Sequence, residues 1–138
     1  MTWAVRFLHD GRETLSRFEW RRAVLPVSAR RGAQLVMMQW GRRPDETGAL
    51  PLGGWAKLTH IQSAAWDRFT PRPVILPVQW FTERDVAGQE KWFQVTRGQY
   101  LQGCVARLSK EQRVYVVTLD CAPGLVEYER WPRIVIGR

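Results

Sequence analysis

Hydrophobic and polar residues alternate along much of the chain, and this period of two predicts β-strands. Turn-forming residues separate the alternating stretches, for example Arg97-Gly98 and Ser109-Lys110-Glu111. Short turns between strands are typical of an antiparallel meander. The predicted strands cover residues 24–27, 35–40, 74–81, 91–96, 100–108, 113–119 and 133–136.

Other segments depart from this alternation. Residues 74–81 form a near-continuous apolar run, which predicts a strand buried on both faces, with Pro77 at a bulge or an edge. Residues 59–69 place apolar side chains on one helical face behind Thr59, a candidate N-cap. Residues 10–17 are expected to form a short helix or a turn, and residues 41–54 a long loop, because Gly and Pro are frequent there.

Together these patterns predict a single domain over residues 1–138, of the α+β class and rich in strands. We expect a curled antiparallel sheet or a partly closed barrel with one main helix. A chain of 138 residues is the length of one domain. No apolar run approaches the roughly 20 residues of a membrane span, and the chain starts without a signal-peptide core, so a cytoplasmic protein without a membrane partner is expected.

The cysteines and histidines predict neither a metal site nor a cofactor. Cys104 and Cys121 lie in apolar strand-like runs, where a free thiol packs as a small hydrophobic group. His9 and His60 are far apart and make no metal-ligand spacing with them. A disulfide between the cysteines would be unusual in the cytosol.

Charge and aromatic content point to a polyanionic partner. The net charge is +8, 18 of the 21 basic residues are arginine, and the chain has 8 tryptophans. A positive field attracts nucleic acid, and guanidinium and indole planes stack on unpaired bases. The alternative is that most tryptophans fill the core and that the arginine pairs lie in solvated turns. Composition leaves both interpretations open.

The order of several fragments resembles the SOS response-associated peptidase (SRAP) family, whose members bind single-stranded DNA and crosslink to abasic sites. The resemblance extends from about Arg17 to Ile136. The fragments are Arg17-Phe18-Glu19 with Ala23-Val24-Leu25-Pro26-Val27, Met38-Gln39-Trp40-Gly41 with Pro44, Gly54-Trp55-Ala56-Lys57, Ile75-Leu76-Pro77 with Phe81-Thr82-Glu83, Val116-Val117-Thr118, and Tyr128-Glu129-Arg130-Trp131-Pro132. The resemblance implies the SRAP fold.

The positions that match the family's catalytic residues are mostly changed. Thr2 stands where the family has the cysteine nucleophile that becomes the N-terminus, and a hydroxyl is a much poorer nucleophile than a thiolate. Glu83 matches the family's acid/base glutamate, although a second alignment would place Thr82 there. Tyr128 replaces the family's histidine, and Trp55 its substrate-positioning asparagine. The resemblance therefore implies a catalytically degenerate domain.

The positions that match the family's binding residues are better kept. Lys57 retains the charge of a phosphate-contacting arginine, and Arg130 is retained within its motif. Arg42 and Arg43 are further candidate phosphate ligands, and Trp55 is a candidate for base stacking or for the core. The family's aromatic pair after Trp-Gly-x-x-Pro is absent, since Asp45-Glu46-Thr47 stands there.

Three hypotheses follow. The first is a degenerate SRAP-like domain that binds single-stranded or damaged DNA in a DNA-damage or phage context. The second is a protein-interaction or accessory module with the same fold and no DNA binding, favoured by the acidic residues of the 41–54 loop. The third is an abasic-site crosslinker in which the Thr2 amine forms an imine with Glu83 as acid/base.

Overall fold

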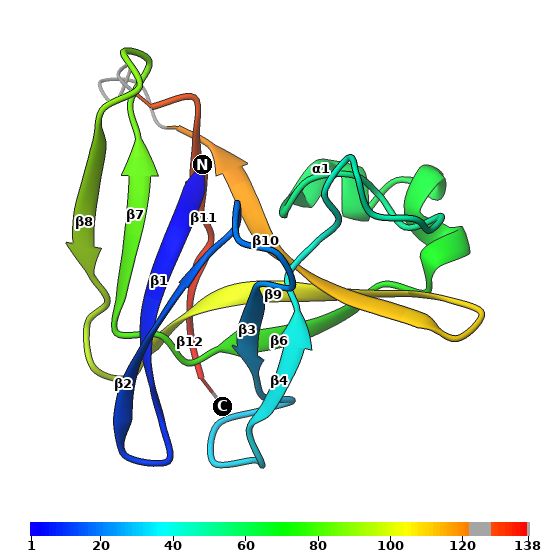
Figure 1. The fold of residues 1–138 in the computed structure, drawn as a ribbon. Helices are drawn as coiled ribbons and strands as arrows, with labels where there is room; N and C mark the ends of the chain where they lie inside the picture. Colours follow the sequence, from blue (N-terminus) through cyan, green and yellow to red (C-terminus); the bar gives the residue numbers. More distant parts are fainter. Residues whose placement is uncertain (122–127, 138) are drawn as a thin grey trace.

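The computed structural model describes residues 1–121 and 128–137, and strands dominate it (Figure 1). The strands are β1 (Thr2–His9), β2 (Arg12–Arg17), β3 (Val24–Val27), β4 (Val36–Gln39), β5 (Trp55–Lys57), β6 (Arg72–Leu76), β7 (Trp80–Arg84), β8 (Glu90–Gln94), β9 (Gln99–Leu108), β10 (Glu111–Asp120), β11 (Arg130–Pro132) and β12 (Ile134–Ile136). Two short helical segments, α1 (Leu58–Ile61) and the 3-10 helix η1 (Ala64–Phe69), lie between β5 and β6.

The first half of the architecture is a four-stranded antiparallel sheet in the order β2-β1-β7-β8. The turn of the β1–β2 hairpin is Asp10-Gly11, and both residues have a positive φ, as two-residue hairpin turns require. Residues 10–17 form a turn and β2, so the helix that was one of the two predicted alternatives is wrong. Asp-Gly between two alternating stretches favours a hairpin.

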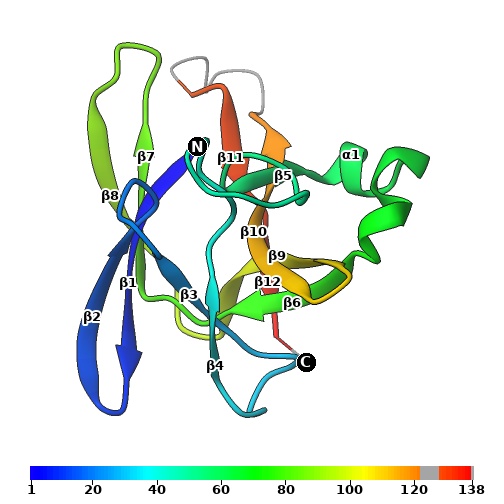
Figure 2. The ribbon, with the colours of Figure 1, turned by 45° about the vertical axis from the view of Figure 1, so that its right-hand side comes forward.

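The second half is a six-stranded sheet centred on β9 and β10, which are ten residues long each. β9 pairs with β6 and β12, and β10 pairs with β11 and, in parallel, with β5. The β3–β4 ribbon joins this sheet through isolated bridges from Ser28 to Ile75 and from Trp40 to Val114. In Figure 2 the sheets curl around a common interior without closing into a barrel.

The apolar run at residues 74–81 is divided between the two sheets. β6 ends at Leu76 and belongs to the six-stranded sheet, whereas β7 begins at Trp80 and belongs to the four-stranded one. Pro77 lies in the break, consistent with its lack of a backbone N–H for a sheet ladder. The expected meander is also interrupted, because β8 and β9 lie in different sheets.

The main core lies between the curled sheets and includes fully buried Val5, Trp40, Leu76 and Val116. A second cluster packs η1 against β9 and β10, with Trp66 on Tyr115 at a ring distance of 5.6 Å. Cys104 belongs to this cluster, and both cysteines are free thiols. These clusters account for only some of the tryptophans, since Trp20 is 45% exposed.

The expected single helix over residues 59–69 is wrong. Thr59 makes no capping hydrogen bond, and the α-helical segment ends at Ile61 after four residues. In η1 the buried residues are Trp66 and Phe69, three positions apart, which suits the three residues per turn of a 3-10 helix. Ala64 and Ala65 would lie on the apolar face of the predicted helix, but in the structure both are exposed. The fold is therefore mainly β rather than α+β.

Candidate functional site at the N-terminus

A buried hydroxyl–carboxylate pair lies at the start of β1. Thr2 Oγ1 donates a hydrogen bond of 2.5 Å to Glu83 Oε2, and both residues are fully buried. Their register depends on a bulge, because Val5 pairs with Phe81 while Thr2 pairs with Glu83, so β1 has one more residue than β7 over this stretch. In an unbroken ladder Trp3 would stand opposite Glu83. The bulge turns Thr2 toward the carboxylate instead.

The N-terminal amine completes this pair. The nitrogen of Met1 lies 3.0 Å from Glu83 Oε1. Burial is the largest influence on Glu83 and raises its pKa, against the opposing effects of the Thr2 hydrogen bond and the positive charges of the amine and Arg130. Glu83 is thus a carboxyl group that retains its proton at higher pH than an exposed glutamate.

Arg130 in β11 and Lys57 in β5 lie near the site, on two strands that both pair with β10. Arg130 Nε and Nη2 donate to Thr118 Oγ1 at 2.8 and 2.6 Å, and its Nη1 lies 3.6 Å from Met1 Sδ. Lys57 pairs with Thr118 across β5 and β10, and its Nζ lies 3.6 Å from Asp120 Oδ1. Burial lowers the pKa of Arg130, with Asp120 opposing. Two cations therefore flank Thr118.

Aromatic side chains form the wall beside Thr2. Trp55 Nε1 donates a hydrogen bond of 2.5 Å to the Thr2 carbonyl oxygen, and its ring packs on Trp3 at 4.7 Å and on Phe18 at 4.8 Å. Arg84 covers Trp3, with its guanidinium carbon 3.9 Å from the ring centre. Half-buried Trp55 therefore both supports the N-terminal backbone and borders the site.

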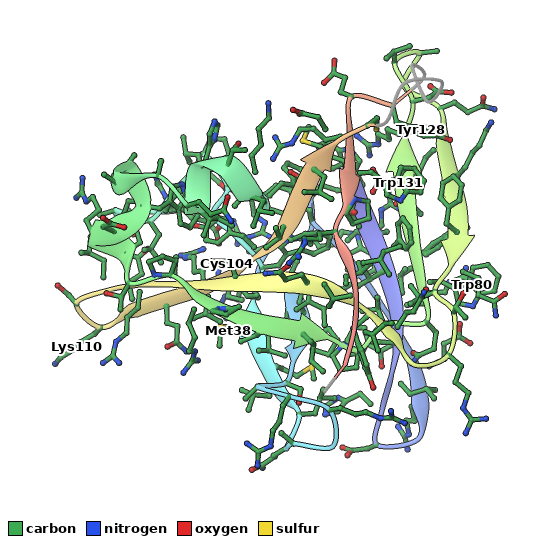
Figure 3. The ribbon with its side chains drawn as sticks, turned by 180° about the vertical axis from the view of Figure 1, so that it is seen from behind. Met38, Trp80, Cys104, Lys110, Tyr128 and Trp131 are labelled. Carbon is green, nitrogen blue, oxygen red and sulfur yellow. The ribbon has the colours of Figure 1, made fainter. Side chains whose placement is uncertain are left out.

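Tyr128, which the resemblance places at the position of the family's histidine, lies in an aromatic cluster and not beside the Thr2–Glu83 pair. Its ring is buried in a cluster with Phe93 and Trp131, at ring distances of 6.0 and 5.2 Å (Figure 3). Among the residues that the structure describes, its hydroxyl makes no hydrogen bond to Thr2 or Glu83. Tyr128 shapes the core near the site and does not join the polar pair.

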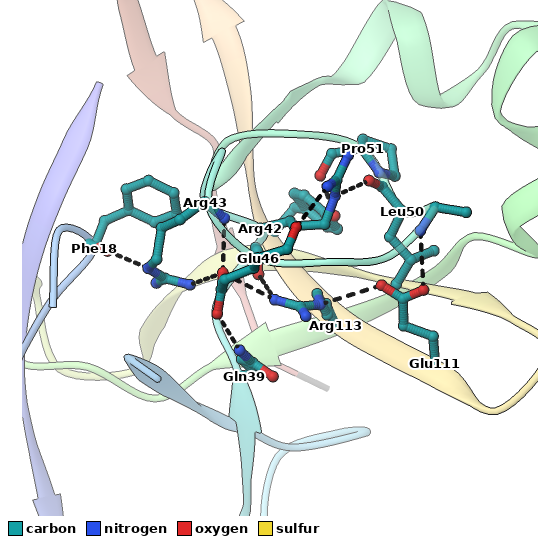
Figure 4. Close-up of polar contacts among 12 residues, drawn as sticks. Phe18, Gln39, Arg42, Arg43, Glu46, Leu50, Pro51, Glu111 and Arg113 are labelled. Carbon is teal, nitrogen blue, oxygen red and sulfur yellow. Dashed lines mark hydrogen bonds and ion pairs between the residues drawn. The ribbon is translucent and has the colours of Figure 1, made fainter. Parts of the chain in front are cut away.

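The arginine pair of the 41–54 loop is engaged by the protein itself (Figure 4). Arg42 donates to the carbonyl oxygens of Leu50 and Glu46 at 2.7 and 2.9 Å. Arg43 is 7% exposed, donates to the Phe18 carbonyl oxygen at 2.8 Å and pairs with Glu46 at 3.0 Å. These bonds fix the loop, and the pair is not available as two free phosphate ligands.

Sequence reasoning missed several neighbours of the Thr2–Glu83 pair. The Met1 amine was assigned no role of its own, and Thr118 appeared only as part of a matched fragment. Cys121, which follows β10, is close enough that the charge of Glu83 adds to the effect of burial in raising its pKa, while the N-terminal amine opposes both. Proximity across sheets, unlike spacing along the chain, leaves no periodic signal in the sequence.

A cleft of about 230 Å³ lies beside Met1, with Trp3, Arg84 and Glu129 among its lining residues, and fully buried Thr2 and Glu83 do not line it. In both ribbon views the N-terminus lies next to the ends of β7 and β11. No group of three His, Cys, Asp or Glu side chains that could hold a metal occurs among residues 1–121 and 128–137. Over the same residues, no helix combines the length and apolarity needed to cross a membrane.

Neither a protein-family model nor a curated protein nor a solved structure matches this chain. The functional argument therefore depends on the geometry of the site and on the resemblance in sequence.

Proposed function

We propose that this protein is an SRAP-like domain that binds single-stranded or damaged DNA and has lost most of the family's catalytic groups. The proposal is supported above all by one observation: Thr2, Trp55 and Arg130 come from distant parts of the chain, and all lie near the buried carboxylate of Glu83. The resemblance in sequence assigns these same four positions to the family's site. Their proximity is what a shared ancestral site would produce.

The electrostatics of the site suit a phosphate backbone. Lys57 is partly exposed and its weak pair with Asp120 leaves its charge accessible. Arg130 has a spare nitrogen on the side of Met1, and the whole chain carries +8. Each phosphate that such cations neutralise releases counterions, so affinity should fall steeply as salt increases.

The structure also weakens the argument for an interaction module without DNA binding. That argument relied on the acidic residues of the 41–54 loop. The Glu46 carboxylate accepts hydrogen bonds from Gln39, Arg43 and Arg113, so its charge is balanced inside the protein. Of the two acidic residues, only Asp45 presents an unbalanced carboxylate among the described residues.

Fluorescence anisotropy of the untagged protein with single-stranded oligonucleotides, with and without an abasic site, tests this function across a salt series. We expect binding with a steep salt slope. The double variant Lys57→Gln/Arg130→Gln should reduce that slope by about 2. Lys110→Gln, at the exposed tip of the β9–β10 hairpin, is the control and should change it little. Absence of binding at low salt would favour the interaction module.

A second function is favoured by the position of the N-terminus: the Met1 amine lies 3.0 Å from Glu83 Oε1, and Thr2, whose amine becomes free once Met1 is removed, pairs with Glu83 across β1 and β7. The Thr2 amine would attack the aldehyde carbon of an abasic sugar. A carbinolamine forms, Glu83 in its protonated form donates a proton to the hydroxyl, and water leaves as the imine forms. The raised pKa of Glu83 favours the protonated form that this proton transfer needs, compared with an exposed glutamate.

Borohydride treatment of the same anisotropy samples tests the second function, because it reduces an imine to a stable amine link. A band that is confined to the abasic oligonucleotide, and that Glu83→Gln weakens and an N-terminal extension abolishes, would establish amine capture. Binding without a trapped band would leave the domain as a DNA-binding protein without that chemistry.

A further inference from the structure

A second concave surface, away from the Thr2–Glu83 pair, gathers arginines from three separate segments. This cleft of about 460 Å³ is lined by Arg21 and Arg22 from the turn after β2, by Arg43 from the 41–54 loop and by Arg113 from β10. The resemblance in sequence gave no indication that these four side chains lie together. We call this surface the arginine cleft.

The rim of the arginine cleft carries two free cations. Arg21 and Arg22 are exposed, and neither makes an ion pair with any carboxylate of the described residues. Arg22 has a φ of 58°, a left-handed conformation that is uncommon for a residue with a long side chain. Such conformations concentrate where a side chain must be held for function.

The floor of the cleft is rigid and rich in hydrogen-bond donors. Arg43 and Arg113 are both more than nine-tenths buried, and they share the single oxygen Oε1 of Glu46 at 3.0 and 3.2 Å (Figure 4). Among the described residues Arg43 Nη2 has no hydrogen-bond partner, and Arg113 Nε lies 3.5 Å from Glu111. This floor holds two guanidinium groups, partly neutralised by Glu46 and Glu111, in fixed positions beneath the rim.

The acidic residues of the cleft do not cancel this charge. Four arginines line it against the three carboxylates Glu19, Asp45 and Glu46. Glu19 pairs at 2.7 Å with Arg17 and at 3.9 Å with Arg84, and neither of these arginines lines the cleft. Glu46 pairs with Arg43 in the floor. Only Asp45 remains to oppose Arg21 and Arg22, so the rim is net positive.

We propose that the arginine cleft binds a phosphate group of single-stranded DNA, with Arg21 and Arg22 as its direct ligands and Arg43 and Arg113 as a fixed positive floor. This inference rests on the proposed DNA binding and extends it to a second anchoring point. Trp20, 45% exposed and adjacent in sequence to Arg21, supplies an indole face on which the neighbouring base stacks. An arginine pair next to an exposed tryptophan thus suits a nucleotide rather than a free phosphate.

The cleft is connected to the N-terminal site by a short series of contacts. The Arg43 guanidinium lies 4.4 Å from the centre of the Phe18 ring, Phe18 lies 4.8 Å from Trp55, and Trp55 donates its hydrogen bond to Thr2. These contacts pass through the buried side chains of Arg43 and Phe18, so the two sites share part of one core.

Anisotropy with charge-matched variants tests this inference. Arg21→Gln/Arg22→Gln removes two charges from the rim, and Arg30→Gln/Arg31→Gln removes two from an equally exposed pair in the loop between β3 and β4. We expect the first variant to lower affinity by about 10-fold or more and to reduce the salt slope by about 1 to 2, with a much smaller effect from the second. Trp20→Ala should weaken binding by about 5- to 10-fold.

A second measurement, NMR titration with pyrophosphate, follows the backbone amides of residues 20–22 and the Nε–H groups of Arg43 and Arg113. We expect shifts in the wild type that are lost in Arg21→Gln/Arg22→Gln. Those shifts would support the phosphate site even if no DNA bound, in which case the proposed DNA function alone would fail.

Two results would overturn the inference. Equal losses in both arginine-pair variants would assign the effect to overall charge. Wild-type affinity in Arg21→Gln/Arg22→Gln, with a loss in Lys57→Gln/Arg130→Gln, would leave the proposed function standing and remove the arginine cleft from it. All variants lie on exposed side chains except Lys57 and Arg130, which are partly buried, and unfolding midpoints would show that each variant remains folded.

Discussion

Two glutamates of this protein are withdrawn from solvent, and their pKa values move in opposite directions. Glu83, beside the N-terminus, has a raised pKa because burial outweighs one hydroxyl donor and the nearby amine. Glu46, in the 41–54 loop, is only partly buried; burial raises its pKa too, but hydrogen bonds from the backbone and side chain of Arg43 and the charge of Arg113 lower it overall. The depth of burial and the number of donors together set the direction of each pKa shift.

The two glutamates therefore differ in role: Glu46 belongs to a hydrogen-bond network that supports a loop, whereas Glu83 is an ionisable group with a raised pKa. Glu46 accepts from Gln39, Arg43 and Arg113 and fixes a long loop. Glu83 is more deeply buried and has fewer donors than Glu46, and groups with perturbed pKa values concentrate at functional sites. The comparison directs functional experiments to Glu83 and stability experiments to Glu46.

Glu46→Gln should have the largest effect. It removes the charge that balances Arg43 and Arg113, both of which are buried, and breaking one side of a buried pair costs about 3 kcal/mol. Urea unfolding of the variant would measure this loss in the free energy of unfolding. Glu13→Gln, whose partner Arg6 is 4.0 Å away on the surface, is the control and should cost less than about 0.5 kcal/mol. Similar values for both would remove the supporting role of Glu46.

Glu83→Gln should alter how stability depends on pH. The pKa of Glu83 in the folded state lies above the ordinary value of 4.5, so the folded protein binds the carboxyl proton more tightly than the unfolded chain does. Glu83 therefore stabilises the protein fully below that value, and this contribution is lost as pH rises through the folded-state pKa.

The wild type should lose up to about 1.4 kcal/mol per pH unit relative to Glu83→Gln in that window. Urea unfolding of both proteins between pH 4 and 8 provides the measurement. Parallel stability curves would contradict the raised pKa. Glu46 has the opposite sign, because its contribution is present above the ordinary value and is lost as pH falls.

Thr2→Val should destabilise the protein by about 1 to 2 kcal/mol, because it leaves a buried carboxyl oxygen without its donor. It should also raise the pKa of Glu83 further, which the carboxyl carbon resonance of Glu83 would report. Thr82→Val is a closely matched control, since Thr82 is equally buried but its hydroxyl has no partner. That change should be neutral or stabilising, and equal losses would show that packing alone matters.

Lys57→Gln should have the smallest effect on stability. Its partner Asp120 lies 3.6 Å away and is 80% exposed, and pairs of this kind contribute less than about 0.5 kcal/mol. The same change should reduce the salt slope of single-stranded DNA binding by about 1. Unchanged DNA binding would separate Lys57 from the proposed site.

Much of the strand framework could be read from the sequence, because alternation and turn residues are local signals. The predicted strands at residues 24–27 and 100–108 are confirmed by β3 and β9. The helix over residues 59–69 could not be predicted correctly, since the burial of Trp66 and Phe69 against Tyr115 depends on a strand about fifty positions away in the chain. Tertiary packing outweighed the local helical pattern there.

The candidate site shows the same division. The resemblance assigned Thr2 and Glu83 to positions of the family's site, and the basic pair Arg42-Arg43 was expected to contact phosphate. The structure engages both arginines with loop carbonyls and Glu46. Ion-pair partners chosen from across a loop cannot be read from spacing, because an exposed and a buried arginine look alike in a sequence.

The sequence by itself determined that the protein is built mainly from strands and that it carries an excess of positive charge, and it suggested a resemblance to a DNA-binding family. These properties are sums or local periods, so they need no folded context. Only the tertiary structure decided that a single extra residue in β1 turns Thr2, and not Trp3, toward Glu83. It also decided the direction of the pKa shift of each glutamate, because desolvation and donor number depend on which strands and loops close around each carboxylate.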